Sequence, residues 1–423
     1  MHDHLSGNED VNPTRAPESP SDRPDPGPAV TTGGTGLPVI VIARTALNVP
    51  LRLSHFFLPA IARGLGVSLS AGGALVSAAN LVGLAGPIFG VFSDQFGGRR
   101  VMVFGTALFA LAALLTAAVP RYGVALAAFA LMSLAKIAFD PALQVFLGQR
   151  VPYERRGRAL GLAELAWSFS LLAMPLSGWL IDTVSWRIPF LLLGLLSFPI
   201  LWLTWRTLPP DGPPTGETGP PVWNLNGTVN SLADLTRQVL ADHQSRLILA
   251  TAGLIGFAQI NILVVYGAWM EDGFGLSVAD LGLVTLIIGA AELGGELAVA
   301  FISDRMGKRR SLIVAVICTA LAYLGLPHLT GSLAAALMGT VLMTLFFEFT
   351  IVGLLPLISG VNANARGTVM ALSSAVGSAT RAIAAPVGVA LYSPGDIGLN
   401  GLLSALACLG LLVVLLQIRE QGH

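Results

Sequence analysis

Long apolar stretches separated by short polar segments make up most of the chain. A helix needs roughly 20 mostly apolar residues to cross a bilayer, and twelve stretches come close to that length. The alternation of apolar and polar residues expected of a membrane β-barrel is absent. Because helices satisfy their own backbone groups in lipid, the pattern predicts an all-α polytopic membrane protein. The twelve stretches lie near residues 37–61, 71–93, 101–119, 124–147, 158–181, 188–205, 246–269, 279–302, 311–327, 332–356, 367–391 and 397–418.

Composition agrees with a membrane protein. Charged residues make up 11% of the chain and the mean hydropathy is +0.73, whereas soluble domains are about a quarter charged. Residues 1–36 are rich in Pro, Gly, Ser and acidic residues, so they are expected to be a disordered tail rather than a signal peptide. Both cysteines, Cys318 and Cys408, fall in apolar stretches, and we therefore expect neither a disulfide framework nor a metal site.

The longest polar gap, residues 206–245, divides the apolar stretches into two sets of six. Its first part is rich in proline and predicts an extended segment. Its second part, NSLADLTRQVLADHQSR, predicts a short amphipathic helix that begins near Ser231; an unstructured linker is the alternative. The predicted organisation is a tail, two six-helix bundles joined by a linker, and a second short tail, at residues 1–36, 37–205, 206–245, 246–418 and 419–423.

Two segments repeat across these halves. GVFSDQFGGRR (Gly90 to Arg100) returns as AFISDRMGKRR (Ala300 to Arg310), and RGRALGL returns as RGTVMAL, both 210 positions later. Several matches at one offset indicate a duplicated six-helix unit, and such internal repeats are typical of transporters.

The distribution of Lys and Arg predicts the orientation. If the amino terminus is cytoplasmic, fourteen of these residues fall in cytoplasmic loops and three in outer loops. The positive-inside rule then places both termini in the cytoplasm.

The duplicated turn resembles the signature of the major facilitator superfamily of secondary transporters, a Gly-x-x-x-Asp-Arg-x-Gly-Arg-Arg type motif between helices 2 and 3 that often recurs between helices 8 and 9. The resemblance covers about residues 37–418 and departs from the signature at Gln95, Gly98 and Ala300. The matching positions are Gly90, Asp94, Gly97, Arg99 and Arg100 in the first copy and Asp304, Arg305, Gly307, Arg309 and Arg310 in the second.

The resemblance implies twelve transmembrane helices in two pseudo-symmetric bundles, and it implies that the turn acts as a conformational latch. Glycine permits a tight reversal, and Asp94 or Asp304 could accept hydrogen bonds from the start of a neighbouring helix. The alternative is that the turn only orients two helices.

Charged residues inside the apolar stretches are the candidates for function, because they are costly in lipid and usually face a cavity. Arg44, Asn48, Arg52 and His55 share one helix face, and arginine suits a carboxylate or phosphate. Simple pairing of Arg52 with a buried acid is the alternative. Lys136 and Asp140 are spaced to pair with each other. The candidate substrate contacts are Arg44, Asn48, Arg52, Lys136, Asp140, Gln259, Asn261 and Arg381.

Four glutamates are candidates for proton coupling. Glu292 and Glu296 are four residues apart, and two nearby carboxylates in a low dielectric cannot both ionise easily. One of them could therefore carry a proton; neutralisation by Arg381 or another buried cation is the alternative. Glu164 and Glu348 complete the set.

The predicted function is secondary active transport of a small molecule across the cytoplasmic membrane, by alternating access and without enzyme activity or a cofactor. Proton-coupled efflux is favoured, because MPLSG (Met174 to Gly178) partly resembles the signature of drug/proton antiporters. Uptake or exchange of an organic anion is the alternative; a non-transporting receptor or a polytopic membrane enzyme is more remote. The expected partners are the substrate, protons and the bilayer, with no nucleic acid, and a monomer is expected.

Overall fold

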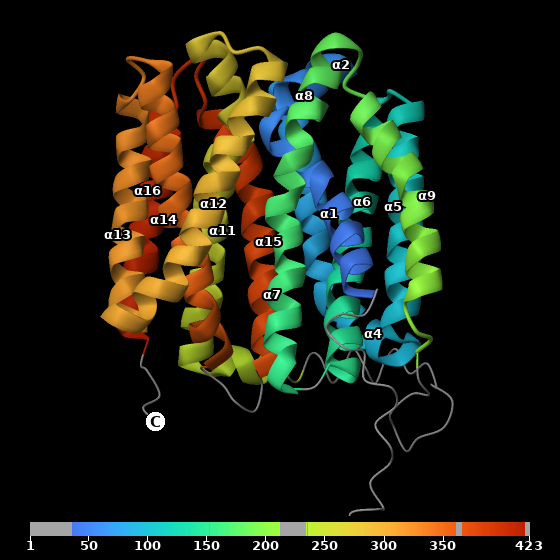
Figure 1. Ribbon diagram of the computed structural model, residues 1–423. Helices are drawn as coiled ribbons and strands as arrows, with labels where there is room; N and C mark the ends of the chain where they lie inside the picture. Colours follow the sequence, from blue (N-terminus) through green and yellow to red (C-terminus); the bar gives the residue numbers. More distant parts are fainter. Residues whose placement is uncertain (1–35, 152, 212–233, 235, 361–365, 419–423) are drawn as a thin grey trace, which may run out of the picture.

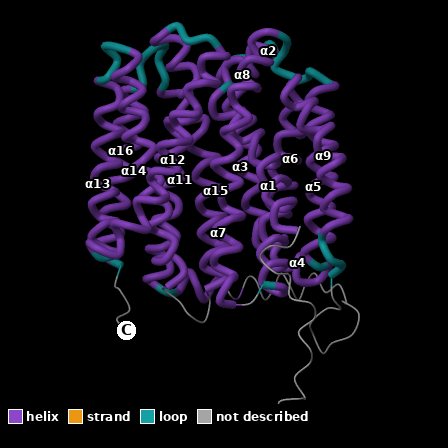
Figure 2. The backbone as a smooth tube through the Cα atoms, in the orientation of Figure 1, coloured by secondary structure: helices purple, strands orange, loops and turns teal. Residues whose placement is uncertain are grey.

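The computed structural model describes residues 36–151, 153–211, 234, 236–360 and 366–418. These residues are helical throughout the core (Figure 2), and their one β-bridge is the isolated pair Ser393 and Asp396. The helices of the first half are α1 (Gly36–Phe56), α2 (Leu58–Leu65), α3 (Leu69–Leu81), η2 (Val82–Ala85), α4 (Gly86–Phe96), α5 (Gly98–Ala118), α6 (Tyr122–Arg150), α7 (Tyr153–Phe169), η3 (Ser170–Ala173), α8 (Met174–Thr183) and α9 (Ile188–Thr207). The helices of the second half are α11 (His243–Phe274), α12 (Val278–Met306), α13 (Lys308–Gly325), η4 (Leu326–His328), α14 (Leu333–Gly360), α15 (Arg366–Leu391) and α16 (Gly398–Gln417).

Twelve helical segments among the described residues are long and apolar enough to cross a membrane. Each overlaps one of the twelve predicted stretches, so the prediction of an all-α protein with twelve spans is confirmed. The helices form because the apolar runs are long, and they end at polar or glycine-containing turns. Gly97 and Gly307, the turn glycines of the two signature copies, both have positive φ, at 88° and 84°, which is the conformation that glycine adopts without steric cost.

The spans that carry no charge in their apolar stretches lie at two opposite sides of the helix bundle. In Figure 1, α5 and α9 pack together on the right side, and α13 and α16 on the left side. Large apolar side chains on these helices are exposed, including Phe104, Trp202, Leu321 and Leu406. Such surfaces suit contact with lipid, while the spans with buried charges occupy the interior.

Two spans of the first half are interrupted. Span 2 is built from α3, η2 and α4, and span 5 from α7, η3 and α8. In each, a 3-10 turn precedes a helix with proline in its first turn, Pro87 in α4 and Pro175 in α8. Proline has no N–H to donate and its ring crowds the preceding turn, so the hydrogen-bonding pattern tightens before it. The second-half helices α12 and α15 are not divided in this way.

The halves meet through α1 with α11, α3 with α15, and α8 with α12. We call the end of the molecule that carries α2 the α2 end, and the opposite end, where α9 stops and α11 starts, the linker end (Figure 1). Close contacts join the halves towards the α2 end. A Cβ placed on Gly267 would lie 2.1 Å from the carbonyl oxygen of Phe56, and one on Gly178 would lie 2.6 Å from that of Val278. The hydroxyl of Ser77 donates to the carbonyl of Ala382 at 2.8 Å. Small residues therefore let the two backbones touch.

The predicted linker helix falls partly outside the described residues, which include neither Ser231 nor Leu235. Residues 236–241 are helical. Within them Val239 is fully buried, while Leu240 is 48% exposed. The two neighbouring apolar side chains therefore do not share one environment.

Candidate functional site

A buried ion pair joins the two halves. Arg52 of α1 donates from Nη1 to Oε1 of Glu292 at 2.7 Å and from Nη2 to Oε2 at 2.6 Å. Glu292 belongs to α12, and the side chains of Arg52 and Glu292 are 2% and 5% exposed. A two-point pair of this kind is strong and directional. The cation that neutralises Glu292 is therefore Arg52, whereas the sequence offered Arg381 as the named alternative.

Arg52 also contacts span 5. Its guanidinium carbon lies 3.9 Å from the centre of the Trp167 ring. Its Nη2 lies 3.5 Å from the Trp167 carbonyl oxygen, and its Nε lies 3.4 Å from Oγ of Ser170. Trp167 and Ser170 were not predicted, because neither carries charge and each sits far from Arg52 along the chain.

A second cluster of charges lies within the first half. Arg44 contacts Asp140 from Nε at 2.9 Å, and Glu164 from Nη1 at 2.9 Å. Lys136 contacts the other carboxylate oxygen of Asp140 at 2.5 Å, so the predicted pairing of Lys136 with Asp140 is confirmed. Two cations and two acids balance one another here. Of the four, Glu164 is the most open, with its side chain 63% exposed.

Glu348 brings a third acid to the Glu292 region. It lies on α14 and is 6% exposed. A Cβ on Gly295 of α12 would lie 2.9 Å from that of Glu348, so Glu348 packs between the positions of Glu292 and Glu296. Among the described residues Glu348 has no hydrogen-bonded or ion-paired partner. Ser168 of α7 lies beside Glu296, which places first-half groups next to this acidic region.

Arg381 brings a cation from α15. Its Nη2 lies 3.5 Å from Oγ of Ser378 on its own helix, and no ion pair to Arg381 occurs within the described ranges. The charges of Arg381 and Arg52 both act on His55 of α1. His55 is 6% exposed and its Nδ1 has no described partner. Arg381 is thus a cation without an ion pair near the junction of the halves, with His55 and the paired Arg52 close to it.

Three predicted substrate contacts, all uncharged, lie on α1 and α11. Asn261 is fully buried, and its Nδ2 donates to the Asn400 carbonyl at 2.8 Å and to Ser404 Oγ at 2.9 Å. Asn261 therefore joins α11 to α16. Asn48 is buried on the Arg52 side of α1, and Gln259 is half-buried.

Sequence and structure comparisons identify the family. The family model described as Major Facilitator Superfamily matches residues 51–385 and again 248–422. The chain belongs to the Major Facilitator Superfamily. It is therefore a membrane transporter of a small molecule and not an enzyme.

Individual members of the superfamily resemble the chain at low identity. An uncharacterised MFS-type transporter of Bacillus subtilis, YceJ, is 26% identical over 73% of this chain and 75% of its own. The cis,cis-muconate transport protein of Acinetobacter baylyi is 25% identical over 57% of this chain and 59% of its own. The crystal structure of the nucleoside transporter NupG has a TM-score of 0.71 at 11% identity, and the match covers 91% of this chain and 99% of that one. The structural likeness shows the shared fold.

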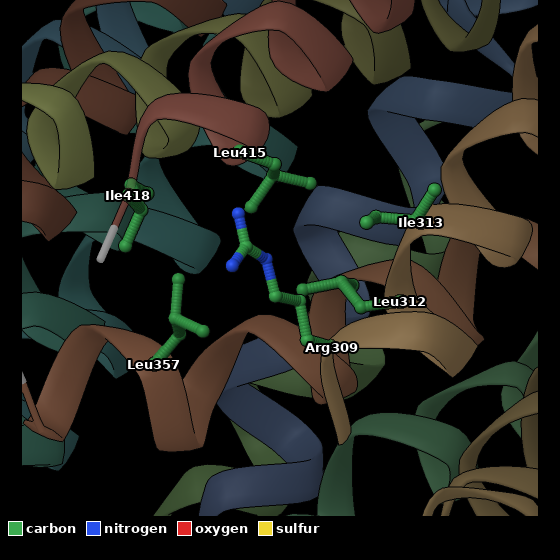
Figure 3. Close-up of a pocket in the computed structure, with 6 residues that line it drawn as sticks. All are labelled: Arg309, Leu312, Ile313, Leu357, Leu415 and Ile418. Carbon is green, nitrogen blue, oxygen red and sulfur yellow. The ribbon is translucent and has the colours of Figure 1, made fainter. Parts of the chain in front are cut away.

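One arginine of each signature copy, Arg99 or Arg309, caps the last helix of its half. Arg99 stacks over the Trp205 ring at 4.3 Å and donates to the Trp205 carbonyl near the end of α9. Arg309 donates to the Leu416 carbonyl at 3.1 Å, near the end of α16. Figure 3 shows its guanidinium between Leu415, Ile418 and Leu357. Basic groups at helix carboxyl ends satisfy free carbonyls and complement the helix dipole.

An acid outside both copies of the signature caps α5. Asp211 accepts hydrogen bonds from the backbone N–H groups of Arg99 and Arg100, at 2.9 and 3.1 Å. A Cβ on Gly97 would lie 2.2 Å from the Asp211 carboxyl carbon, so glycine makes room for this cap. The side chains of Asp94 and Asp304 lie outside the described residues. Gly90 lies within α4 with open space around it, while Arg100, Arg305 and Arg310 are exposed at the linker end.

A further ion pair lies at the α2 end. Arg63 of α2 contacts Glu271 of α11, with Nη1 to Oε2 at 2.6 Å. The sequence gave no indication of this contact, because the two residues are 208 positions apart. The pair joins the halves on the side where their backbones already touch.

Proposed function

We propose that this protein is a proton-coupled secondary transporter that carries a small organic anion by alternating access. The observation that supports it best is the set of charges left after the ion pairs are formed. Arg44 and Lys136 are matched by Asp140 and Glu164, and Arg52 is matched by Glu292. Of the candidate charges within the spans, Arg381, Glu296 and Glu348 remain without an ion-pair partner among the described residues, and Glu348 is the more buried of the two acids.

Arg381 is the proposed anion contact. A guanidinium presents a planar fork that fits a carboxylate, and a buried charge without a partner is costly. A bound carboxylate would supply the missing negative charge, and His55 could contact the same ligand. The relative named for transport of cis,cis-muconate, a dicarboxylate, also favours an organic anion.

Glu348 is the proposed proton carrier. It is buried beside Glu292 and Glu296, and neighbouring carboxylates resist simultaneous ionisation. One anion on Arg381 and one proton on Glu348 would remove the unpaired charge of each of these two groups, which favours passage of the loaded site through a low-dielectric interior. Symport of the anion with a proton follows from this arrangement.

In alternating access, the end of the protein at which the two halves touch would open while the opposite end closes. The close contacts described above lie towards the α2 end, and the excess of Lys and Arg favours a cytoplasmic linker end. On that orientation the end at which these contacts lie faces outward. Opening the α2 end requires the contact of Gly267 with Phe56 to separate, together with the ion pair of Arg63 with Glu271.

The anion contact can be tested by thermal stability in detergent. Small mono- and dicarboxylates should raise the melting temperature of the wild-type protein, since a ligand at about 100 times its Kd adds roughly 2.7 kcal/mol. Arg381→Gln should abolish the shift and Arg381→Lys should retain part of it. Arg121→Gln, which removes an exposed arginine at the α2 end, is the matched control and should respond as wild type. Stabilisation by lipophilic cations alone would overturn the proposal in favour of efflux.

The proton carrier can be tested in liposomes with a stabilising carboxylate as substrate. With one proton per anion, an inward gradient of about one pH unit supports about tenfold accumulation, because tenfold corresponds to about 1.4 kcal/mol. Glu348→Gln should equilibrate the anion without accumulating it, while anion exchange continues. Accumulation at the wild-type level would exclude Glu348 as the carrier. Accumulation driven by the opposite gradient would indicate antiport, as the MPLSG segment suggested.

A further inference from the structure

The interrupted region of span 5 lies against the ion pair that joins the halves. The 3-10 turn η3 begins at Ser170, directly after α7 ends at Phe169. The Ser170 hydroxyl donates to the Trp167 carbonyl at 2.5 Å. The same carbonyl and the same hydroxyl oxygen face the guanidinium of Arg52. One side chain therefore contacts both the break in span 5 and, through Glu292, the second half.

The two sets of contacts differ in length. Arg52 holds the Glu292 carboxylate at 2.6 and 2.7 Å, which is typical of strong charge-assisted bonds. It approaches Trp167 O and Ser170 Oγ only to 3.5 and 3.4 Å, at the limit of hydrogen bonding. If Glu292 lost its charge, the two acceptors in span 5 would be the nearest uncharged alternatives for the guanidinium.

We propose that Arg52 transmits the charge state of Glu292 to the break in span 5, with Trp167 and Ser170 as its positioning residues. When Glu292 is neutralised, Arg52 moves onto the Trp167 carbonyl and Ser170 hydroxyl, and α7 changes its angle to the rest of the first half. This inference rests on the proposed proton coupling. In this proposal, span 5 bends within the first half, in addition to the movement of the two halves relative to each other.

The groups around Glu292 fit this role. Arg52 faces it from α1, Glu348 approaches from α14, and Glu296 lies one turn away on α12. His55 of α1 lies near both Arg52 and Arg381. A proton that enters the Glu348 region can thus reach Glu292 by sharing among adjacent carboxylates.

The test measures a distance inside the first half, which movement of whole rigid halves leaves unchanged. Cys318 and Cys408, the two cysteines of the chain, are replaced by serine, and spin labels are placed at Arg100 of α5 and Arg158 of α7, both exposed near the linker end. Glu292→Gln should shift the distance by about 2 Å or more, the scale of helix movements in switching proteins. A label pair at Arg100 and Arg206 of α9 is the control and should not shift.

The positioning residues are tested in the same background. Trp167→Leu combined with Ser170→Ala should abolish the shift that Glu292→Gln produces. An unchanged distance in Glu292→Gln, or a shift that survives loss of both positioning residues, would overturn the inference. If Glu292→Gln does not fold, a pH titration of the labelled chain with native Glu292 replaces it and should show the same shift at low pH. The readout needs no substrate, so its outcome is separate from that of the transport assays.

Discussion

Replacing Arg52 with glutamine should destabilise the protein by about 3–5 kcal/mol, the usual cost of removing one partner of a buried ion pair. The reason is that Glu292 would keep a buried charge with no cation at bonding distance, since Arg52 supplies both of its short contacts. Thermal melting of the purified protein in detergent measures the effect, and transport in liposomes should be lost at the same time.

The double substitution Arg52→Gln with Glu292→Gln is the matched control. It removes both charges, and replacing both partners of a buried pair is often nearly neutral. The melting temperature should therefore return towards the wild-type value, while coupling to the proton gradient stays lost. If the single and double variants melt at the same low temperature, the destabilisation arises from lost packing against Trp167 rather than from an unpaired charge.

Adding one methyl group at Gly267 should shift the protein away from the described conformation. In Gly267→Ala the new Cβ would lie 2.1 Å from the Phe56 carbonyl oxygen, a backbone atom of the other half. Overpacking costs about 1–3 kcal/mol, and such a cost changes a two-state population about 5- to 150-fold. Cysteine labelling at the α2 end should become faster by a comparable factor.

Gly273→Ala provides the matched control on the same helix. A Cβ there would have its nearest neighbour at 3.7 Å, which is ordinary van der Waals contact, so labelling should stay at the wild-type rate. Equal labelling rates in Gly267→Ala and in the wild type would mean that the two halves adjust without separating.

Most of the fold could be predicted because it depends on local pattern. Span length, apolar composition and the repeated turn are properties of short segments, and they placed all twelve spans. The contact of Lys136 with Asp140 was predictable for the same reason, since a helix brings residues four apart together. The glycines of the two turns followed from the need for a tight reversal.

The partners of the buried charges could not be predicted, because they depend on which helices meet. Arg52 and Glu292 are 240 positions apart, and the helix face that holds Arg52 does not reveal its partner. Trp167 and Ser170 contact Arg52 through a backbone carbonyl and a hydroxyl. Such groups are common in the core of a helix bundle, so nothing in the sequence marks these two residues. Asp211 follows the last helix of the first half and lies outside both copies of the signature. Asn261 contacts a neighbouring helix, and an amide in a span fits a helix–helix contact as well as a substrate contact.

The glycine contacts between the halves have a consequence for the leak of protons across the membrane. A transporter that uses a proton gradient must not become a passive route for protons, since a leak would dissipate the gradient on which it depends. Where Gly267 rests on Phe56 and Gly178 rests on Val278, backbone meets backbone, and no water molecule fits between those pairs of atoms. For the proton-coupled transport proposed above, the absence of side chains at these two positions would restrict a leak of protons through the α2 end.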